Sequence, residues 1–195
     1  MRASIKILLV YLFFFINFIG CLNPCGGDVD KVSPYFKIKN INIYNQSANG
    51  SAFKSNDEIR FTEHRLYVYI SPEYYAHNSS MTGFKTIACS PLDPGYMGTN
   101  ERISQMKITS DRDFDDKHDA NTSLNDLILA NTSFVASKKT LNDYLQEVKN
   151  TPSINGILLY FSSPPSKKQS QIFTVEYTLT NGKTFTSKTL PIVIY

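Results

Sequence analysis

Alternation of apolar and polar residues is clearest near the C-terminal end of the chain. Four apolar side chains alternate there with threonine and glutamate: Phe173, Val175, Tyr177 and Leu179. A period of two is typical of a β-strand with one buried face. The following Thr180-Asn181-Gly182 predicts a three-residue hairpin loop with Gly182 in the left-handed conformation. Because a buried face fixes the register, this loop would pair Tyr177 with Phe185.

The same kind of pattern predicts further strands over residues 36–43, 65–70, 84–89, 103–108 and 157–161. In the first, the alternation shifts by one place at Asn40, as a β-bulge would cause. In the second, Leu66, Val68 and Ile70 share one face. The last segment is apolar throughout, which predicts a central strand buried on both faces. Pro191 cannot donate a ladder hydrogen bond, so the final strand is predicted to be an edge strand or a bulged strand.

Two segments in the middle of the chain have the features of short helices, TSLNDLILA (122–130) and KTLNDYLQEVKN (139–150). Each opens with Thr or Ser and has an aspartate three residues on, Asp126 or Asp143, as in a capping box with Asp in place of Glu. The whole pattern predicts a mainly β fold. We expect an immunoglobulin-like β-sandwich of antiparallel strands over residues 35–195, with a short helical insertion around residues 123–149.

The first twenty residues have the pattern of a secretory leader. Ile7 to Gly20 is apolar apart from Asn17 and follows a basic start at Arg2 and Lys6. As a helix this stretch would cover about 21 Å, which is shorter than the roughly 30 Å hydrocarbon core of a bilayer. Residues 1–20 are therefore predicted to be a cleaved signal peptide.

Phe18-Ile19-Gly20-Cys21 resembles the lipobox of bacterial lipoproteins, in which the cysteine becomes the first residue and carries acyl chains. Gly20 and Cys21 match that pattern, whereas Phe18 stands where leucine is usual. The resemblance implies lipidation of Cys21, stable anchoring and a place in the bacterial cell envelope, with the outer membrane as the expected membrane. Residues 21–34 would form a flexible tether. The alternative is an ordinary cleaved leader with Cys21 as a disulfide cysteine.

Lipidation of Cys21 would leave Cys25 and Cys89 as an even pair in an oxidising compartment. A bridge between them would stabilise the fold by about 4 kcal/mol in the chain-entropy model. Two unpaired thiols are the alternative, because sequence spacing does not fix disulfide geometry. The chain also has five N-x-S/T tripeptides, which an Asn-, Ser- and Thr-rich sequence produces by chance: Asn45, Asn49, Asn78, Asn121 and Asn131.

The charge balance excludes one class of partner. Removal of residues 1–20 takes Arg2 and Lys6 away and leaves 18 basic and 17 acidic residues. A nucleic-acid interface needs a clustered basic face, whereas the basic residues here form only isolated pairs. We therefore expect no nucleic-acid partner. The sequence also lacks H-E-x-x-H, C-x-x-C, G-x-S-x-G and Gly-rich phosphate-loop motifs, so no cofactor is predicted.

The densest charged segment is DRDFDDKHD, residues 111–119. Carboxylates are preferred ligands of Ca²⁺, which makes Asp111, Asp113 and Asp115 candidate metal ligands. The spacing of an EF-hand loop is absent. We favour a solvated loop with Phe114 as its buried anchor. A cation-dependent hydrolase that uses this loop is the alternative.

Several tyrosines are candidates for ligand contact, since tyrosine combines a large contact area with a polar tip. Tyr74, Tyr75 and Tyr96 follow or lie near strand ends and are assigned to a protein or glycan ligand. Tyr67 and Tyr69 are interpreted as cross-strand packing instead.

Three longer segments, together with the lipobox, resemble small Bacteroidetes lipoproteins of unknown function: ACSPLDPGY, ITSDRDFDDKHDANTSLND and FTVEYTLTNGKTFTSKTLPI. The resemblance implies an envelope location and a β-sandwich, and it carries no catalytic residues. We expect a lipoprotein held to the membrane by its N-terminal lipid and acting as a non-catalytic binding or accessory module. The alternatives are the cation-dependent hydrolase and a structural subunit that exchanges a strand in a surface assembly.

Overall fold

Three β-sheets form the framework of the described part of the chain in a computed structural model, which describes residues 33, 35–75, 94–95, 97–131, 137–149 and 156–195. The largest sheet has five strands in the order β1 (Tyr35–Ser47), β3 (His64–Tyr75), β7 (Gly156–Phe161), β5 (Ile128–Asn131) and β6 (Lys139–Thr140). A second has the order β10 (Thr184–Lys188), β9 (Phe173–Leu179) and β4 (Ile103–Ser110). The third has the order β2 (Glu58–Ile59), β11 (Ile192–Ile194) and β8 (Gln169–Gln171).

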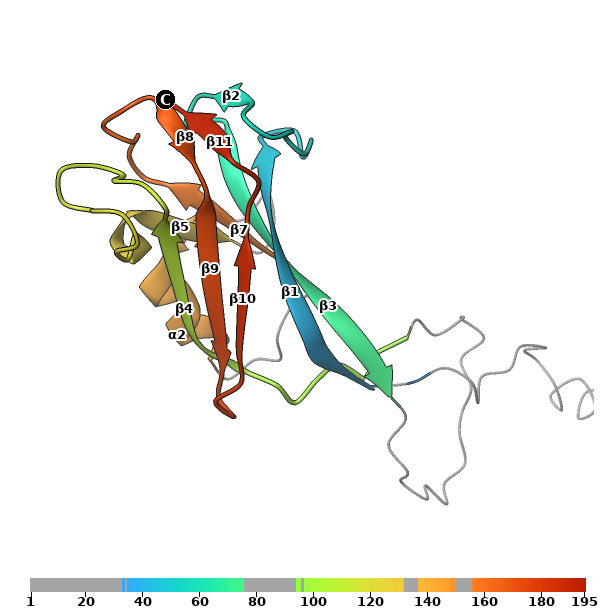
Figure 1. Ribbon diagram of the computed structural model, residues 1–195. Helices are drawn as coiled ribbons and strands as arrows, with labels where there is room; N and C mark the ends of the chain where they lie inside the picture. Colours follow the sequence, from blue (N-terminus) through green and yellow to red (C-terminus); the bar gives the residue numbers. More distant parts are fainter. Residues whose placement is uncertain (1–32, 34, 76–93, 96, 132–136, 150–155) are drawn as a thin grey trace, which may run out of the picture.

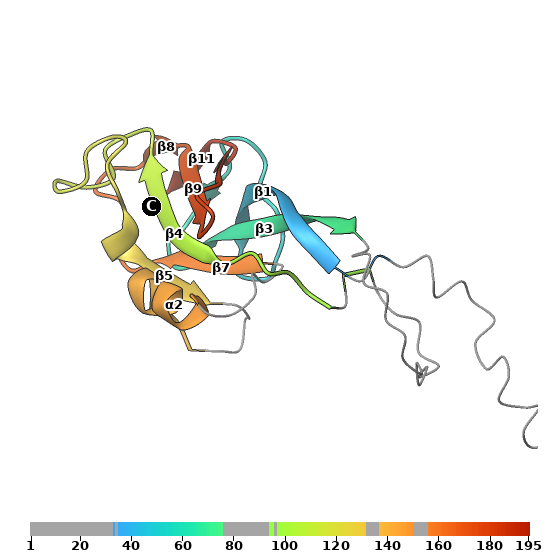
Figure 2. The same ribbon diagram turned by 90° about the horizontal axis from the view of Figure 1, so that it is seen from below.

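The first two sheets form the layers of a β-sandwich, as Figures 1 and 2 show. The core lies between them and takes alternate residues from each strand. Its largest fully buried side chains include Phe114, Phe173 and Tyr177. The predicted mainly β fold of antiparallel strands with a short helical element is therefore confirmed. Among the named strands that the structure describes, only the two-residue β2–β11 ladder is parallel.

The β1–β3 pair is the longest ladder among the described strands, and its inner face is apolar. Register shifts between Ile38 and Asn40, where Lys39 has no partner on β3, which confirms the predicted β-bulge. Ile38 and Ile41 both reach the core in spite of their odd spacing because the bulge restores the alternation. In Figure 1 one end of this pair extends beyond the sandwich as an arm, defined here as residues 35–39 and 71–75.

Two further strand predictions are confirmed. β7 lies between β3 and β5, and residues 157–161 are buried on both faces. Phe185 pairs with Tyr177, and Gly182 has a φ of 83°, as the three-residue loop requires. The Leu179 amide donates to the Lys183 carbonyl across the loop, at 2.9 Å.

One of the two predicted helices is wrong. Residues 141–148 form α2 (Leu141–Val148), with the Thr140 Oγ1 accepting a hydrogen bond from the Asp143 amide. The segment 122–130 instead contains only a short 3₁₀ turn, η2 (Asn125–Leu127), and then enters β5. Its apolar run pairs with β7 in the sheet, and sheet pairing outweighs the local helix signal.

The chain changes sheets at Pro191. The prediction of an edge strand holds for β10, which has a ladder partner only on β9. It is wrong for β11, which follows the proline and lies between β2 and β8. Pro191 lies in the connection, where its carbonyl accepts a hydrogen bond from the Asn56 amide at 2.7 Å. Among the described residues, no helix has the length and hydropathy needed to cross a membrane.

The outer edge of β4 is closed in part by the side chain of Asn125, beside backbone bonds such as the Leu124 amide to the Ile108 carbonyl. Its Nδ2 donates to the Met106 carbonyl at 2.8 Å, and its Oδ1 accepts from the Ile108 amide at 3.0 Å. The side-chain amide thus makes the two bonds that a neighbouring strand would make. It joins the η2 turn to the second sheet and leaves less of the β4 edge open for another chain.

We predict that Asn125→Ala lowers the free energy of unfolding by about 2 kcal/mol, because the Met106 carbonyl and the Ile108 amide lose a part-buried partner. Urea denaturation measures the change. Asn100→Ala is the matched control, since Asn100 is exposed, and it should change stability by less than about 0.5 kcal/mol. Equal stability of the two variants would contradict the role given to Asn125.

Candidate functional site

The outer face of the β1–β3 pair carries a group of tyrosines, called the tyrosine platform here and consisting of Tyr44, Tyr67 and Tyr69. Tyr44 lies opposite Tyr67 in the ladder, and the Tyr67 and Tyr69 ring centroids are 6.4 Å apart. Tyr44 is 47% exposed and Tyr69 is 37% exposed. These side chains lie on the face away from the core, because their strand neighbours such as Ile43 and Val68 are buried.

The Tyr67 ring lies over Gly156 of β7, which is opposite Tyr69 in the ladder and has no side chain. A Cβ built on Gly156 would be 2.5 Å from the Tyr67 Oη and 2.6 Å from its Cε2. Any other residue at position 156 would therefore push the ring away. The Tyr67 and Tyr69 rings are tilted by 39° to each other.

The polar groups beside the platform include uncharged amides and a hydroxyl, together with Arg65 opposite Gln46 and Lys188 in the adjoining groove. Asn42 Nδ2 donates to Ser71 Oγ at 3.0 Å, and Gln46 Nε2 donates to the Gly50 carbonyl at 2.9 Å. Toward the other end of the sheet, Arg65 and Lys138 lie over the Tyr160 ring, at 5.3 and 4.0 Å from its centroid. The platform thus combines aromatic rings with amide and hydroxyl groups.

A groove of about 270 Å³ adjoins the platform where the edges of β1 and β10 face each other. Its lining includes Asn42 and Tyr44 from β1, Phe53 from the following loop, and Ser187 and Leu190 from the β10 side. The two edges are joined by single side-chain bonds, such as the Ile43 amide to Ser187 Oγ at 3.2 Å. Tyr44 and Asn42 therefore belong to both a flat surface and a concave one.

Two of the tyrosines assigned to a ligand from the sequence lie away from this platform. Tyr74 and Tyr75 are in β3 itself, at the end of the arm, and are 46% and 37% exposed. Tyr96 lies outside the described residues. The sequence assignment missed Tyr44, although the alternation after the bulge, with Ile41 and Ile43 buried, already turns it outward.

The three candidate metal ligands each hold the backbone of their own region. Asp111 Oδ1 accepts from the Ile172 amide at 2.7 Å, and Asp113 Oδ1 accepts from the Ala120 amide at 2.9 Å. Asp115 Oδ1 accepts from the Lys117 and His118 amides and from the His118 ring. Among the described residues, no group of three or more His, Cys, Asp or Glu has the geometry to hold a metal ion.

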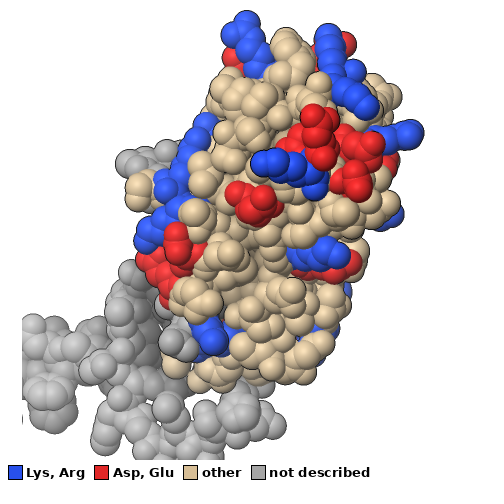
Figure 3. All heavy atoms as spheres, turned by 90° about the vertical axis from the view of Figure 1, so that its left-hand side faces the viewer, with Lys and Arg blue, Asp and Glu red and all other residues tan. Residues whose placement is uncertain are grey.

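Phe114 is fully buried in this loop, as expected of its anchor. It stacks on Phe161 with a centroid distance of 4.9 Å. Figure 3 shows the side of the molecule that carries the loop, where lysines and arginines lie between the carboxylates instead of leaving one continuous acidic patch. The geometry is that of a structured surface loop.

His118 is held between two carboxylates at the base of the loop. Its Nδ1 is 2.7 Å from Asp115 Oδ1, and its Nε2 is 3.1 Å from both Asp126 carboxylate oxygens. The hydrogen bond to Asp115 raises the pKa of His118, burial opposes this, and Asp126 adds to the rise. Asp126 therefore contacts His118 and does not cap a helix, so the predicted capping role is wrong.

His64 has the opposite environment, inside the core. Its ring stacks on Phe161 at a centroid distance of 5.8 Å, and its Nε2 is 3.0 Å from Asn45 Oδ1. Asn45 Nδ2 donates in turn to the Leu190 carbonyl at 2.7 Å. Burial lowers the pKa of His64 to about 3, so the ring is neutral and its Nε2–H donates to Asn45.

The tripeptide asparagines give no pattern of a glycosylated surface. Asn45 and Asn131 are 5% and 4% exposed, and Asn121 has a φ of 63°. Cys21, Cys25 and Cys89 lie outside the described residues, as do residues 1–20 and almost all of residues 21–34. The lipidation, the disulfide and the tether stay predictions.

The chain matches no protein-family model, no curated protein and no solved structure.

We predict that the fold loses stability as the pH falls below 6.5 because His64 must be protonated on unfolding. Its folded pKa of about 3 lies below the ordinary value of 6.5. Above pH 6.5 the contribution of neutral His64 to the free energy of unfolding is complete. Below pH 6.5 this free energy falls by about 1.4 kcal/mol per pH unit, so about 2 kcal/mol is lost at pH 5. Urea denaturation between pH 7 and pH 5 measures the slope, which His64→Gln should reduce.

His118→Gln is the matched control for this slope. The pKa of His118 is raised, so its stabilising contribution is complete below pH 6.5 and is lost as the pH rises through the folded pKa. Its removal should leave the decline below pH 6.5 in place. If the wild-type and His64→Gln slopes coincide there, the assignment to His64 is wrong.

Proposed function

We propose that this chain is a lipid-anchored, non-catalytic binding domain of the bacterial cell envelope and that the tyrosine platform and its groove bind a neutral glycan. The observation that carries the proposal is the position of the Tyr67 ring over Gly156, beside Tyr44 at the mouth of a groove. Sugar rings have apolar C–H faces that stack on aromatic rings. Their hydroxyl groups pair with amides and phenols, which tyrosine and asparagine supply here.

The size and chemistry of the surface support a glycan over a protein. A stable protein interface needs about 800 Å² from each partner, whereas the platform consists of three rings. Its nearest polar groups include the uncharged Asn42, Gln46 and Ser71, while Arg65 lies opposite Gln46 and Lys188 lines the groove. Aromatic and amide groups on one side of a groove match a ligand that is rich in hydroxyls.

The acidic loop supports binding over hydrolysis. Asp111 accepts a hydrogen bond from the Ile172 amide, 61 residues along the chain, and Asp113 accepts from the Ala120 amide, 7 residues along. Asp115 holds His118. These carboxylates act as braces for the loop and point to separate partners, so the proposal includes no cation-dependent step.

The strand edges give little support to strand exchange. The Ile43 amide on β1 donates to Ser187, and the Ile38 carbonyl accepts from Lys183 Nζ at 3.2 Å. Asn125 closes part of the β4 edge. Because side chains already use these backbone groups, a second chain would have to displace them before it could pair.

The anchoring part of the proposal rests on the sequence. The apolar leader is too short to span a bilayer, and Gly20-Cys21 follows it with the lipobox pattern. A domain held by lipid at Cys21 would meet envelope glycans at a membrane surface, where a weak, shallow binding site is sufficient.

We predict saturable binding of the mature chain, residues 21–195, to at least one member of a panel of neutral hexasaccharides. The panel contains cello-, xylo-, malto-, manno- and chito-oligosaccharides, and isothermal titration calorimetry is the measurement. Tyr67→Ala should weaken binding about fivefold, which corresponds to about 1 kcal/mol for one aromatic contact. Gly156→Ala should weaken it too, because the added Cβ displaces the Tyr67 ring.

Tyr195→Ala is the control. Tyr195 is exposed, follows β11 at the C-terminus and is far from the platform. Its affinity should equal that of the wild type. Circular dichroism verifies that all variants are folded. Either the absence of binding across the panel or equal affinity of Tyr67→Ala and wild type would overturn the glycan assignment.

We predict a fatty-acylated mature protein that begins at Cys21. Intact-mass spectrometry of protein extracted from membranes of a bacterium that expresses the full chain is the measurement. Cys21→Ser should give an unacylated product, because the acyl chains need the thiol. An unmodified wild-type chain, or one that starts at another residue, would disprove the anchor.

A further inference from the structure

A second exposed aromatic group, separate from the platform, lies at the free end of the arm. We call it the arm tip and define it as Tyr35, Tyr74, Tyr75 and Met97. Tyr35 and Tyr75 are opposite each other in the ladder and stack with a centroid distance of 5.9 Å. Tyr74 packs edge-on against Phe36. Met97 is 54% exposed, and Tyr74 and Tyr75 are 46% and 37% exposed.

The arm tip is joined to the backbone behind it by hydrogen bonds. The Phe36 amide donates to the Gly98 carbonyl at 3.1 Å, and the Gly95 amide donates to the Ser33 carbonyl at 2.9 Å. These bonds hold Gly95 and Gly98 alongside the start of β1. Large apolar groups are thus kept in solvent on an ordered support, although burying them is favourable.

The chain enters the domain at this same place. β1 begins at Tyr35, so the segment that leads back to Cys21 leaves from the arm tip. Ser33 is twelve positions after Cys21, and an extended chain spans at most about 3.6 Å per residue. The Cα of Ser33, which borders the arm tip, is therefore no more than about 43 Å from the Cα of the cysteine that would carry the lipid.

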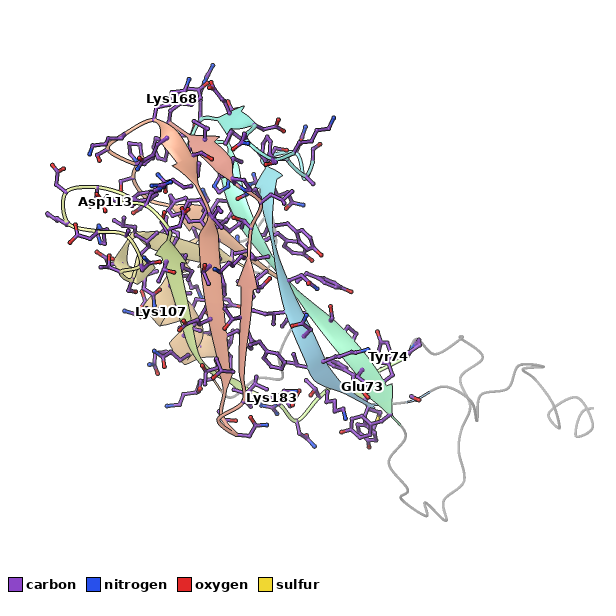
Figure 4. The ribbon with its side chains drawn as sticks, in the orientation of Figure 1. Glu73, Tyr74, Lys107, Asp113, Lys168 and Lys183 are labelled. Atoms are coloured by element: carbon purple, nitrogen blue, oxygen red, sulfur yellow. The ribbon has the colours of Figure 1, made fainter. Side chains whose placement is uncertain are left out.

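The opposite end of the molecule has a different character. Figure 4 shows Glu73 and Tyr74 at the end of the arm and Lys168 at the far end. Lys168 makes an ion pair with Glu58 at 2.6 Å and lies over the Tyr195 ring at 4.9 Å. The end that carries the cluster of exposed tyrosines is thus the one closest to the proposed anchor.

We propose that the arm tip contacts the lipid–water interface of the membrane to which Cys21 is anchored. The inference rests on the anchoring part of the proposed function. Tyrosine suits this interface because its ring enters the apolar region while its hydroxyl group stays with water and headgroups. Behind the tip, Lys37 and Glu73 form an ion pair at 3.6 Å, and opposite charges there favour neither anionic nor cationic lipids.

The contact would fix the height of the tyrosine platform. Tyr44 is nine residues along β1 from Tyr35, which corresponds to roughly 30 Å at about 3.3 Å per residue. One pair of strands would then touch the bilayer at one end and hold the binding face above the membrane surface near the other.

The chain has no tryptophan, so a single introduced tryptophan reports on one position. We would prepare residues 21–195, which contain every residue of the described core, with Cys21→Ser, an N-terminal polyhistidine tag and Tyr75→Trp. This protein is attached through its tag to phosphatidylcholine vesicles that contain a nickel-chelating lipid. Tryptophan emission is measured on vesicles whose lipids carry brominated acyl chains and on vesicles whose lipids carry unbrominated chains. Bromine quenches tryptophan only at contact.

We expect a blue-shifted emission that brominated lipid quenches several-fold more strongly for Tyr75→Trp than for Tyr195→Trp. Tyr195→Trp is attached in the same way and reports on the far end. Addition of Tyr74→Ser and Met97→Ser to Tyr75→Trp should reduce the quenching, because the tip loses apolar surface. Circular dichroism verifies the fold of each variant.

Equal emission of Tyr75→Trp with brominated and unbrominated lipid would overturn the inference. Equal quenching of Tyr75→Trp and Tyr195→Trp would also overturn it, because the contact would then have no preferred end. The artificial tether replaces the acyl chains, so this result is independent of whether Cys21 is acylated. Intact-mass spectrometry tests the natural anchor separately.

Discussion

The pairing of β1 with β3 is the interaction on which the rest of the molecule depends. Its inner face supplies Ile41, Val68 and other core residues, and its outer face carries the tyrosine platform. Because the side-chain period of a strand is two, one register fixes both faces together. The bulge at Lys39 keeps that register compatible with the core on both sides of it. A shift by one residue would bury Tyr44 and expose Ile43.

This dependence explains how much of the fold could be predicted from the sequence. Alternation locates strands with one buried face, and the Tyr177–Phe185 register follows from it once the loop is recognised. The run Ile128–Ala130 carries no such information, because three apolar residues fit a helix or a strand equally well. Pairing with β7, at Phe161 and its neighbours, decides that this run forms a strand. That partner is about thirty residues away, beyond any local pattern.

The candidate site was less predictable for a similar reason. Tyr67 was interpreted as packing, and half of that holds, since its ring covers Gly156. What no local pattern shows is that a glycine on another strand leaves room for the ring. For the acidic segment, the sequence favoured a solvated loop anchored by Phe114 and left a metal site as the alternative. The structure shows backbone amides as partners of Asp111 and Asp113, and the Ile172 amide is brought near only by the fold.

The two exposed groups of tyrosines differ in what surrounds them, and this difference separates their proposed roles. Beside the platform, Asn42 and Ser71 offer hydrogen bonds next to aromatic rings, which favours a hydroxylated ligand over hydrocarbon. At the arm tip the neighbours of Tyr74 are Phe36 and Tyr75. The tip carries the thioether of Met97, whereas the platform has amide side chains beside it. Amphipathic rings with apolar neighbours suit an interface between water and lipid. Under the two proposals, the same residue type would serve two surfaces along one ladder, and its immediate neighbours would decide which ligand each surface prefers.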